Sequence, residues 1–426
     1  MSRVHNVVSG DTLGAIAVRY LGSASKWTQI TGANPQLANR RKAVDGSPLI
    51  FVGDALIIPT DQTESRPVSP APKKPIVLSD KEQDVSIIVD GKKFTGFTSY
   101  KLKLSYDSFD TFSFSAPYDT NIKELREITA PFTYKMCEVY YNDELIFKGV
   151  LLTPAPELKD KSSEITLEGY PICGVLNDCM IPPTKYPLQC MGINMKGIAD
   201  AACEPYSIPV IFDGEVGENF TEVSIEPTDK ILDFLSRLAK QRNLLFTNNE
   251  KGQLVFFNPN PEKAFVTFEE GKLPLISIKP KFKAQEFYSH ITGFGKTDAE
   301  YPSMAWTFEN KYLINKGIIR HHSLTIEDSE NISDLENAVK AHAGRMFADC
   351  MSFELTCENH VNEKNEVFMK GMDVCVRAPS VMITNETMFI ARNVELLRTV
   401  EGKTAVINLV LPGAYTGEIP EDLPWE

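Results

Sequence analysis

The chain of 426 residues has a formal net charge of −13 and 42% hydrophobic residues, and this length corresponds to roughly two to four packed domains. The negative charge argues against a sequence-independent nucleic-acid binder, which needs a basic face. DNA can still slide through a passage with acidic walls without binding to it. No apolar run approaches the ~20 residues of a membrane span, and the N-terminal MSRVHNVVSGD lacks the apolar centre of a signal peptide. We therefore expect no membrane span and synthesis in the cytoplasm.

Residues 1–60 predict a small module with the order strand, helix, helix, strand. A turn at Ser9–Thr12 precedes the first helix, and Asn34 with Pro35 is a breaker signal that ends the second helix. The apolar stripe of the first helix consists of Leu13, Ile16, Ala17 and Tyr20.

These residues resemble a LysM domain. The matching segments are His5–Val7, Gly10–Leu13, Ile16–Ala17, Trp27, Ile30, Asn34–Pro35 and Gly53–Pro59. The insert Leu37–Phe51, with the basic residues Arg40, Arg41 and Lys42, departs from the family pattern. The resemblance implies that N-acetylglucosamine polymers bind in a groove between two loops. The loop residues in this sequence are Gly10, Asp11, Thr12, Leu13, Ile30, Asn34 and Pro35.

A second interpretation of this module is a docking tag for a protein partner, with Gly10–Thr12 serving only as a turn and helix cap. The adjacent basic residues of the insert suit an acidic protein surface at least as well as a glycan. After the module, residues 61–83 contain four prolines among Ser and Lys residues and predict an extended, semi-rigid linker.

Period-two alternation is strongest in Ser99–Pro117, which predicts a β-hairpin with one apolar and one polar face. A hairpin alone is marginally stable, so it must belong to a larger sheet. Further alternating strands at Val85–Gly91, Cys137–Leu152 and Ser163–Tyr170 predict a small antiparallel β-barrel or sandwich over residues 84–170.

Residues 171–270 predict an α/β insertion. It contains helices at Met195–Cys203 and Thr228–Asn243, the second capped by Thr228 or Asp229, and a hairpin over Leu244–Phe257.

Residues 271–412 predict a second β-domain with a helical insertion at about 329–350, and residues 413–426 form an acidic C-terminal tail. The second barrel is expected to be built from Leu275–Gly295 and Phe353–Leu411. The fold class is therefore mainly β (α+β).

Motifs for catalysis or metal binding are missing from the sequence. The six histidines form no HExxH, and neither a P-loop, a GxSxG nor a GxGxxG is present. Adjacent His321 and His322 would face opposite ways on a strand, and Cys203 lacks the flanking sequence of a cysteine peptidase. The eight cysteines contain no CxxC pair, so we expect them to be reduced and structural. We expect no enzyme, no metal and no cofactor.

The order of segments after the linker resembles the baseplate hub proteins of contractile phage tails and related injection systems, the Mu-type and late control D families. The segments that carry the resemblance are Phe112–Pro117, Phe147–Val150, Ile231–Leu244, Gly252–Phe256, Lys370–Val374, Gly402–Ala405 and Leu411–Pro412. The resemblance implies two barrels of tail-tube type in each chain and a homotrimer with a pseudo-six-fold ring.

Such a ring connects the hexameric tail tube to the trimeric central spike. The implied partners are the tail tube protein, a spike protein that we expect to be a separate chain because no β-helical extension follows Glu426, and baseplate wedge proteins. The LysM head would bind a neighbouring baseplate or tube protein, or peptidoglycan. The implied location is the baseplate of a virion or particle that assembles in the host bacterial cytoplasm.

The alternative is a LysM-anchored peptidoglycan hydrolase or a cell-wall-binding protein. A hub should elute as a trimer without cell-wall lytic activity, whereas a hydrolase should clear a cell-wall gel.

Overall fold

The computed structural model describes residues 3–21, 23–43, 47–59, 85–94, 97–159, 162–259, 266–295, 304–326, 329, 331–399 and 401–426. Two compact units, Met1–Lys73 and Lys74–Glu426, divide the chain, and each is described by itself. The linker predicted at 61–83 lies outside the described residues.

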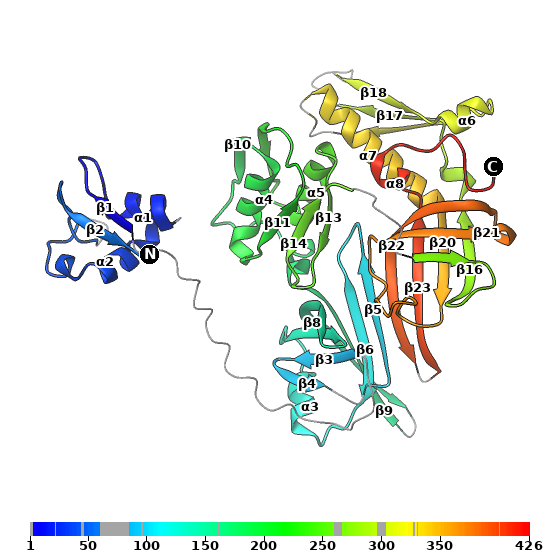
Figure 1. Ribbon diagram of the computed structural model, residues 1–426, viewed down its shortest axis with the longest axis horizontal. Helices are drawn as coiled ribbons and strands as arrows, with labels where there is room; N and C mark the ends of the chain where they lie inside the picture. Colours follow the sequence, from blue (N-terminus) through cyan, green and yellow to red (C-terminus); the bar gives the residue numbers. More distant parts are fainter. Residues whose placement is uncertain are drawn as a thin grey trace. The chain divides into compact units, whose positions relative to one another are not determined.

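The first unit has the order strand, helix, helix, strand that the sequence predicts (Figure 1). Strands β1 (Arg3–Asn6) and β2 (Ala55–Ile58) pair antiparallel, and helices α1 (Leu13–Leu21) and α2 (Trp27–Ala33) lie between them in sequence. Because apolar side chains recur on one stripe of α1, the helix buries that stripe in a small core. The core consists of Val7, Leu13, Ile16, Ala17, Leu21, Ile30, Leu37, Leu56 and Ile58.

A sheet of 13 strands dominates the second unit, in agreement with the predicted mainly β class. The strands from the N-terminal half, with one helix, are β3 (Val85–Val89), β4 (Lys92–Phe94), β5 (Ser99–Ser105), β6 (Thr111–Pro117), α3 (Lys123–Ile128), β7 (Met136–Tyr141), β8 (Glu144–Lys159) and β9 (Ser162–Pro171). Those from the C-terminal half are β15 (Val266–Glu269), β16 (Leu275–Phe282), β20 (Met351–Cys357), β21 (Asp373–Ala378), β22 (Ile383–Thr399) and β23 (Gly402–Val410). We call these two sets the first and second β-domain.

The two β-domains repeat one strand order. The first runs β5-β6-β9-β8-β7-β3, and the second runs β16-β20-β23-β22-β21-β15. The long strands β8 and β22 both change partners along their length, and both carry an irregularity, between Leu151 and Thr153 and between Ala391 and Asn393. One pairing differs, since β3 joins β7 antiparallel while β15 joins β21 parallel.

Direct strand pairing joins the two β-domains into one sheet. Strand β5 pairs antiparallel with the second half of β22, from Asn393 opposite Ser105 to Arg398 opposite Tyr100. The hairpin predicted at Ser99–Pro117 is confirmed as β5 and β6 (Figure 1). Its apolar face, with Leu102, Leu104, Phe112 and Phe114, is buried in a core shared by both β-domains.

An α/β unit lies between the β-domains in sequence. Its elements are β10 (Gln189–Ile193), α4 (Met195–Cys203), β11 (Val210–Asp213), β12 (Phe220–Ser224), α5 (Ile231–Gln241), β13 (Leu245–Asn248) and β14 (Leu254–Phe257). The cap predicted for α5 is wrong, because the N-cap residue is Lys230 and its side chain forms no cap hydrogen bond. Asp229 instead accepts a hydrogen bond of 2.7 Å from the side chain of Arg237, which belongs to α5.

A small sheet stands apart from the large one, with the order β18-β17-β19 (Figure 1). Its elements and neighbours are β17 (His290–Phe294), β18 (Ala305–Glu309), α6 (Lys311–Asn315), β19 (His321–Thr325), α7 (Ile332–Cys350) and α8 (Gly413–Thr416). The expectation that β17 belongs to the second barrel is wrong. Its pattern of alternation is that of any half-buried strand, and α7 covers it through Leu335 and Val339.

Candidate interaction sites

The seven loop residues predicted in the LysM module fall into two groups. Gly10, Thr12 and Pro35 are exposed and Asp11 is half-buried, whereas Leu13, Ile30 and Asn34 are buried. Gly10 has φ +95°, a backbone conformation that side chains disfavour. A ligand can therefore touch the first group directly, and the second group only supports the loops.

Asp11 and Asn34 hold the two loops in place by hydrogen bonds. The Asp11 carboxylate accepts from the Val8 amide at 3.0 Å and lies 2.8 Å from Nε2 of His5, and these contacts lower its pKa. The Asn34 side chain donates to the carbonyls of Ile30 and Ile57, both at 2.7 Å, and accepts from the Ile57 amide. Asn34 thus fastens the end of α2 to β2.

The exposed face of the β1–β2 sheet carries apolar side chains together with Asn6. Val4 lies opposite Ile57 in the strand register, and their side chains are 64% and 43% exposed. Val8, after β1, and Phe51 and Val52, before β2, are also exposed, and we call the five residues the LysM apolar face. Contiguous exposed apolar residues mark interaction sites. The basic insert flanks this face with exposed Arg41 and Lys42, while Arg40 pairs with Asp54.

A buried polar cluster connects three parts of the second unit. Nζ of Lys370 lies 2.7 and 2.8 Å from the two carboxylate oxygens of Asp110, and it also contacts Thr247 Oγ1 and the Asn248 carbonyl. Asp110 follows the β5–β6 turn, Thr247 and Asn248 belong to β13, and Lys370 precedes β21. We call these four residues the clasp, because they join the two β-domains and the α/β unit.

The electrostatics of the clasp depend on burial. The Asp110 side chain is only 2% exposed. Burial raises the pKa of its carboxyl, while the Lys370 ammonium and hydrogen bonds from the Ser105 amide and Asn248 act against that rise. A buried ion pair of this kind is costly to break because the remaining charge has no water around it. The clasp is a structural feature, since its members already satisfy each other.

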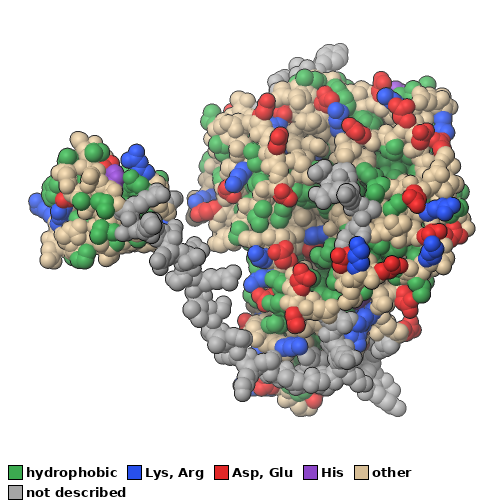
Figure 2. Space-filling view, viewed as in Figure 1, with side chains coloured by type: hydrophobic (Ala, Val, Ile, Leu, Met, Phe, Trp, Pro, Cys, Tyr) green, Lys and Arg blue, Asp and Glu red, His purple; other side chains and the backbone are tan. Residues whose placement is uncertain are grey.

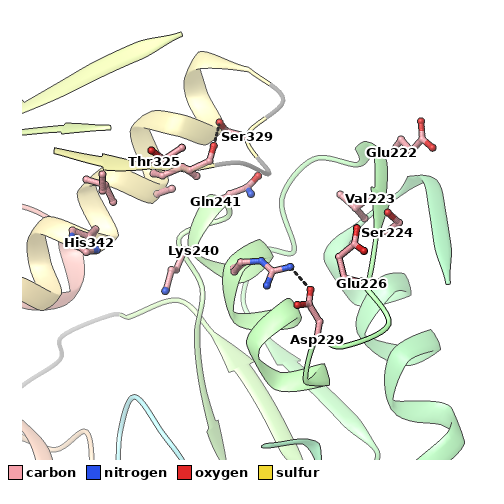
Figure 3. Close-up of a pocket in the computed structure, with 14 residues that line it drawn as sticks. Glu222, Val223, Ser224, Glu226, Asp229, Lys240, Gln241, Thr325, Ser329 and His342 are labelled. Atoms are coloured by element: carbon pink, nitrogen blue, oxygen red, sulfur yellow. Dashed lines mark hydrogen bonds and ion pairs between the residues drawn. The ribbon is translucent and has the colours of Figure 1, made fainter. Parts of the chain in front are cut away.

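A groove of about 800 Å³ lies between the α/β unit and the segment that links β19 to α7 (Figure 3). Figure 3 shows Glu226 and Asp229 on one side of this space and His342 on the other. Lys240 of α5 also lines it. At the end of α5, Arg242 pairs with buried Asp334 of α7 and stacks over the Phe220 ring at 3.9 Å. This pair fixes the two walls.

The groove contains one histidine and one lysine whose pKa values are lowered. Burial lowers the pKa of His342 to about 4 and that of Lys240 to about 8, with nearby cations contributing in both cases. His342 is therefore neutral at pH 7 and stacks on His322 at 5.9 Å. His321 instead stacks on His290, so the adjacent histidines have different partners, as predicted.

The cysteines are free, as predicted, and six of the eight are buried. Cys203 lies in the core of the α/β unit, where burial and Asp200 raise its thiol pKa to about 12. Such a thiol supplies almost no thiolate at neutral pH.

Within the described ranges, no three His, Cys, Asp or Glu side chains gather as metal ligands, and no helix is long and apolar enough to cross a bilayer. Figure 2 shows acidic and basic side chains interspersed on the visible face.

Comparison with known proteins finds two matching domain families and several proteins of similar fold. Residues 173–258 match the family model of the baseplate hub protein gp44-like second domain, and residues 5–59 match the LysM domain model. The second unit has the fold of phage tail proteins. The 43 kDa tail protein of prophage MuSo2 from Shewanella oneidensis matches with a TM-score of 0.66 and 21% identity over 78% of this chain and 99% of that one. The tail protein from Neisseria meningitidis matches with a TM-score of 0.65 and 16% identity over 78% and 98%.

The chain thus contains one domain that matches the baseplate hub gp44-like model and one LysM domain, and its second unit has the fold of phage tail proteins, which confirms the resemblance predicted from the sequence. Among individual proteins, the chain is similar to the baseplate hub protein gp44 of Escherichia phage Mu. The two are 18% identical over 337 residues, which cover 76% of this chain and 87% of that protein.

Proposed function

We propose that three copies of this chain form the hub of a contractile tail or tail-like injection particle. The ring would contain six β-domains and would connect a six-fold tail tube to a three-fold central spike, with baseplate wedge proteins around it. The observation that carries this proposal is the repeat of one strand order within each chain. A chain with two equivalent domains presents six similar units when it forms a trimer, and can match both symmetries.

Such a hub would act as a structural connector and would not catalyse a reaction. The polar face of β5 and β6, with Lys101, Lys103, Ser113 and Ser115, would line the lumen, through which DNA would pass without specific binding. No cofactor takes part. The hub would assemble in the host bacterial cytoplasm and remain in the baseplate.

The test is the mass of the purified full-length chain by light scattering, followed by a cell-wall clearing assay. We expect a trimer that leaves the cell wall intact. A chain that stays monomeric at micromolar concentration contradicts the hub. Clearing of the cell wall would favour the LysM-anchored hydrolase instead.

We further propose that the LysM head docks on a neighbouring baseplate or tube protein. The LysM apolar face and the basic insert support a protein partner with an apolar patch and an acidic rim. Val4→Asp places a charge on this face and should reduce co-purification with assembled baseplates at least tenfold. The matched control is Val18→Asp, which changes a residue of α1 that is 53% exposed and should have no effect.

Sedimentation with insoluble peptidoglycan tests the other role of the head. We expect the wild-type chain to stay in solution. If it sediments, and if Thr12→Ala abolishes sedimentation while Val4→Asp does not, the head binds glycan through the loops and the docking proposal is wrong.

A further inference from the structure

We propose that the ring closes where β8 of one copy meets β16 of the next, in the register that β22 and β5 use within one chain. The inference rests on the trimer proposed above and identifies its contact surface. Two edges of the large sheet pair with no strand among the described residues. These are the second half of β8, Thr153–Leu158, and the side of β16 that faces away from β20. One head-to-tail contact of this kind, made three times, closes a ring.

The internal repeat supplies the register. In β22, the first pair after the irregularity is Asn393 with Asn408 of β23. In β8, the first pair after the irregularity is Thr153 with Glu168 of β9. Thr153 is therefore the equivalent of Asn393. Across the sheet, the same correspondence places Pro280 of β16 at the position of Leu102 in β5. The four pairings that establish this are Phe112–Gly169, Phe353–Leu409, Leu102–Phe112 and Pro280–Phe353.

The predicted contact pairs apolar residues on the core face, as the joint within the chain does. Within the chain, Leu102 lies opposite Leu396 and Leu104 opposite Val394. The equivalent pairs between two copies are Pro280–Pro156, Phe282–Pro154 and Ile278–Leu158. Phe282 is 44% exposed, whereas its equivalent Leu104 is fully buried. Leu158, at the position of Arg398, is 85% exposed. The exposed edges are therefore apolar where the repeat requires a partner.

Charge is complementary on the polar face. Within the chain, Lys101 of β5 forms an ion pair of 2.7 Å with Glu395 of β22. In the proposed register, Lys279 of β16, which lies 4.0 Å from Glu354 within the chain, also lies opposite Glu157 of β8, at the positions of Lys101 and Leu397. A second copy thus matches both faces of the edge in shape and charge, and it is the occupant to which we commit.

Prolines make this contact different from the joint within the chain. Pro154 and Pro156 lie in the β8–β9 ladder and Pro280 lies in the β16–β20 ladder, although proline has no amide hydrogen to donate. The alternation of an antiparallel ladder therefore turns the proline nitrogens toward the open edges. A strand that pairs with either edge finds no amide donor at the proline positions. Side-chain contacts therefore have to hold the two copies together. The missing donors also discourage pairing with unrelated strands.

Cysteine cross-linking of the full-length chain tests the register. Residues directly opposite in antiparallel strands have Cα atoms about 4.5–5.5 Å apart, within the span of a disulfide. The double variant Glu157→Cys/Lys279→Cys should give reducible covalent dimers and trimers on oxidation. The matched control Glu157→Cys/Lys123→Cys moves one thiol to the exposed face of α3 and should remain monomeric on a denaturing gel, as should the wild-type chain with its native cysteines.

The outcomes separate this inference from the proposed function. A trimer by mass that gives no more cross-linking than the control overturns the β8–β16 contact and leaves the hub proposal standing, whereas a monomer overturns both. A second variant, Leu158→Asp, should weaken trimer association at least tenfold. Ile319→Asp, which changes a residue that is 74% exposed, should not weaken it, and equal effects of the two changes would also overturn the contact.

Discussion

Replacing Lys370 by methionine should lower the free energy of unfolding by about 3–5 kcal/mol, the range for removing one partner of a buried ion pair. The Asp110 carboxylate is 2% exposed and would lose the cation that lies 2.7 and 2.8 Å from its two oxygens. The methionine stem fills a similar volume, so the loss reflects the charge rather than a cavity. Denaturant unfolding followed by circular dichroism measures this effect.

Two further variants identify the cause. The double variant Asp110→Asn/Lys370→Met removes both charges and should regain part of the lost stability, because no carboxylate is then left buried without a cation. Lys272→Met removes an ammonium from an exposed pair with Glu269 and should leave the unfolding midpoint unchanged. If Lys370→Met unfolds at the wild-type midpoint, the clasp does not hold the three parts together.

Arg242→Leu should cost about 3–5 kcal/mol for the same reason, but at a different junction. Arg242 and Asp334 are each only 6% exposed in their side chains, and Arg242 also donates to the Glu218 carbonyl at 3.1 Å. Its loss removes the cation beside the Asp334 carboxylate in the first turn of α7 and the cation over the Phe220 ring. Thermal unfolding monitored by calorimetry checks the result.

Arg237→Leu is the matched control on the same helix. Arg237 forms a more exposed pair with Asp229, with side chains 40% and 23% exposed, and exposed pairs contribute about 0–1 kcal/mol. Equal destabilisation by the two substitutions would mean that burial of the Arg242–Asp334 pair is not what stabilises the junction.

Local patterns predicted the local elements well. The strands at Ser99–Pro117 follow from strict alternation of Leu and Phe with Lys and Ser, and the structure pairs them as expected. The helix predicted over Thr228–Asn243 is found as α5, which is shorter at both ends. Its apolar stripe identifies the helix, but a polar side chain before it does not guarantee a cap.

Contacts between distant segments had no signal in a single sequence. The pairing of β5 with β22 joins segments from opposite ends of the second unit, and either strand could have paired elsewhere on alternation alone. The clasp was missed because a lysine in a turn and an aspartate in a hairpin loop are ordinary surface residues until the fold buries them. The parallel pairing of β17 with β19 was missed for the same reason.

Strand β22 is synthesised long after β5, and this delay matters while the chain is on the ribosome. Domains generally fold from the N-terminus as the chain emerges, so β5 meets β6 early but waits for almost the whole remaining chain before its other side is covered. During that interval a seven-residue strand without proline presents unpaired backbone groups to every other nascent copy. Rapid translation of the C-terminal half, or a chaperone that shields β5, would protect the yield of soluble protein.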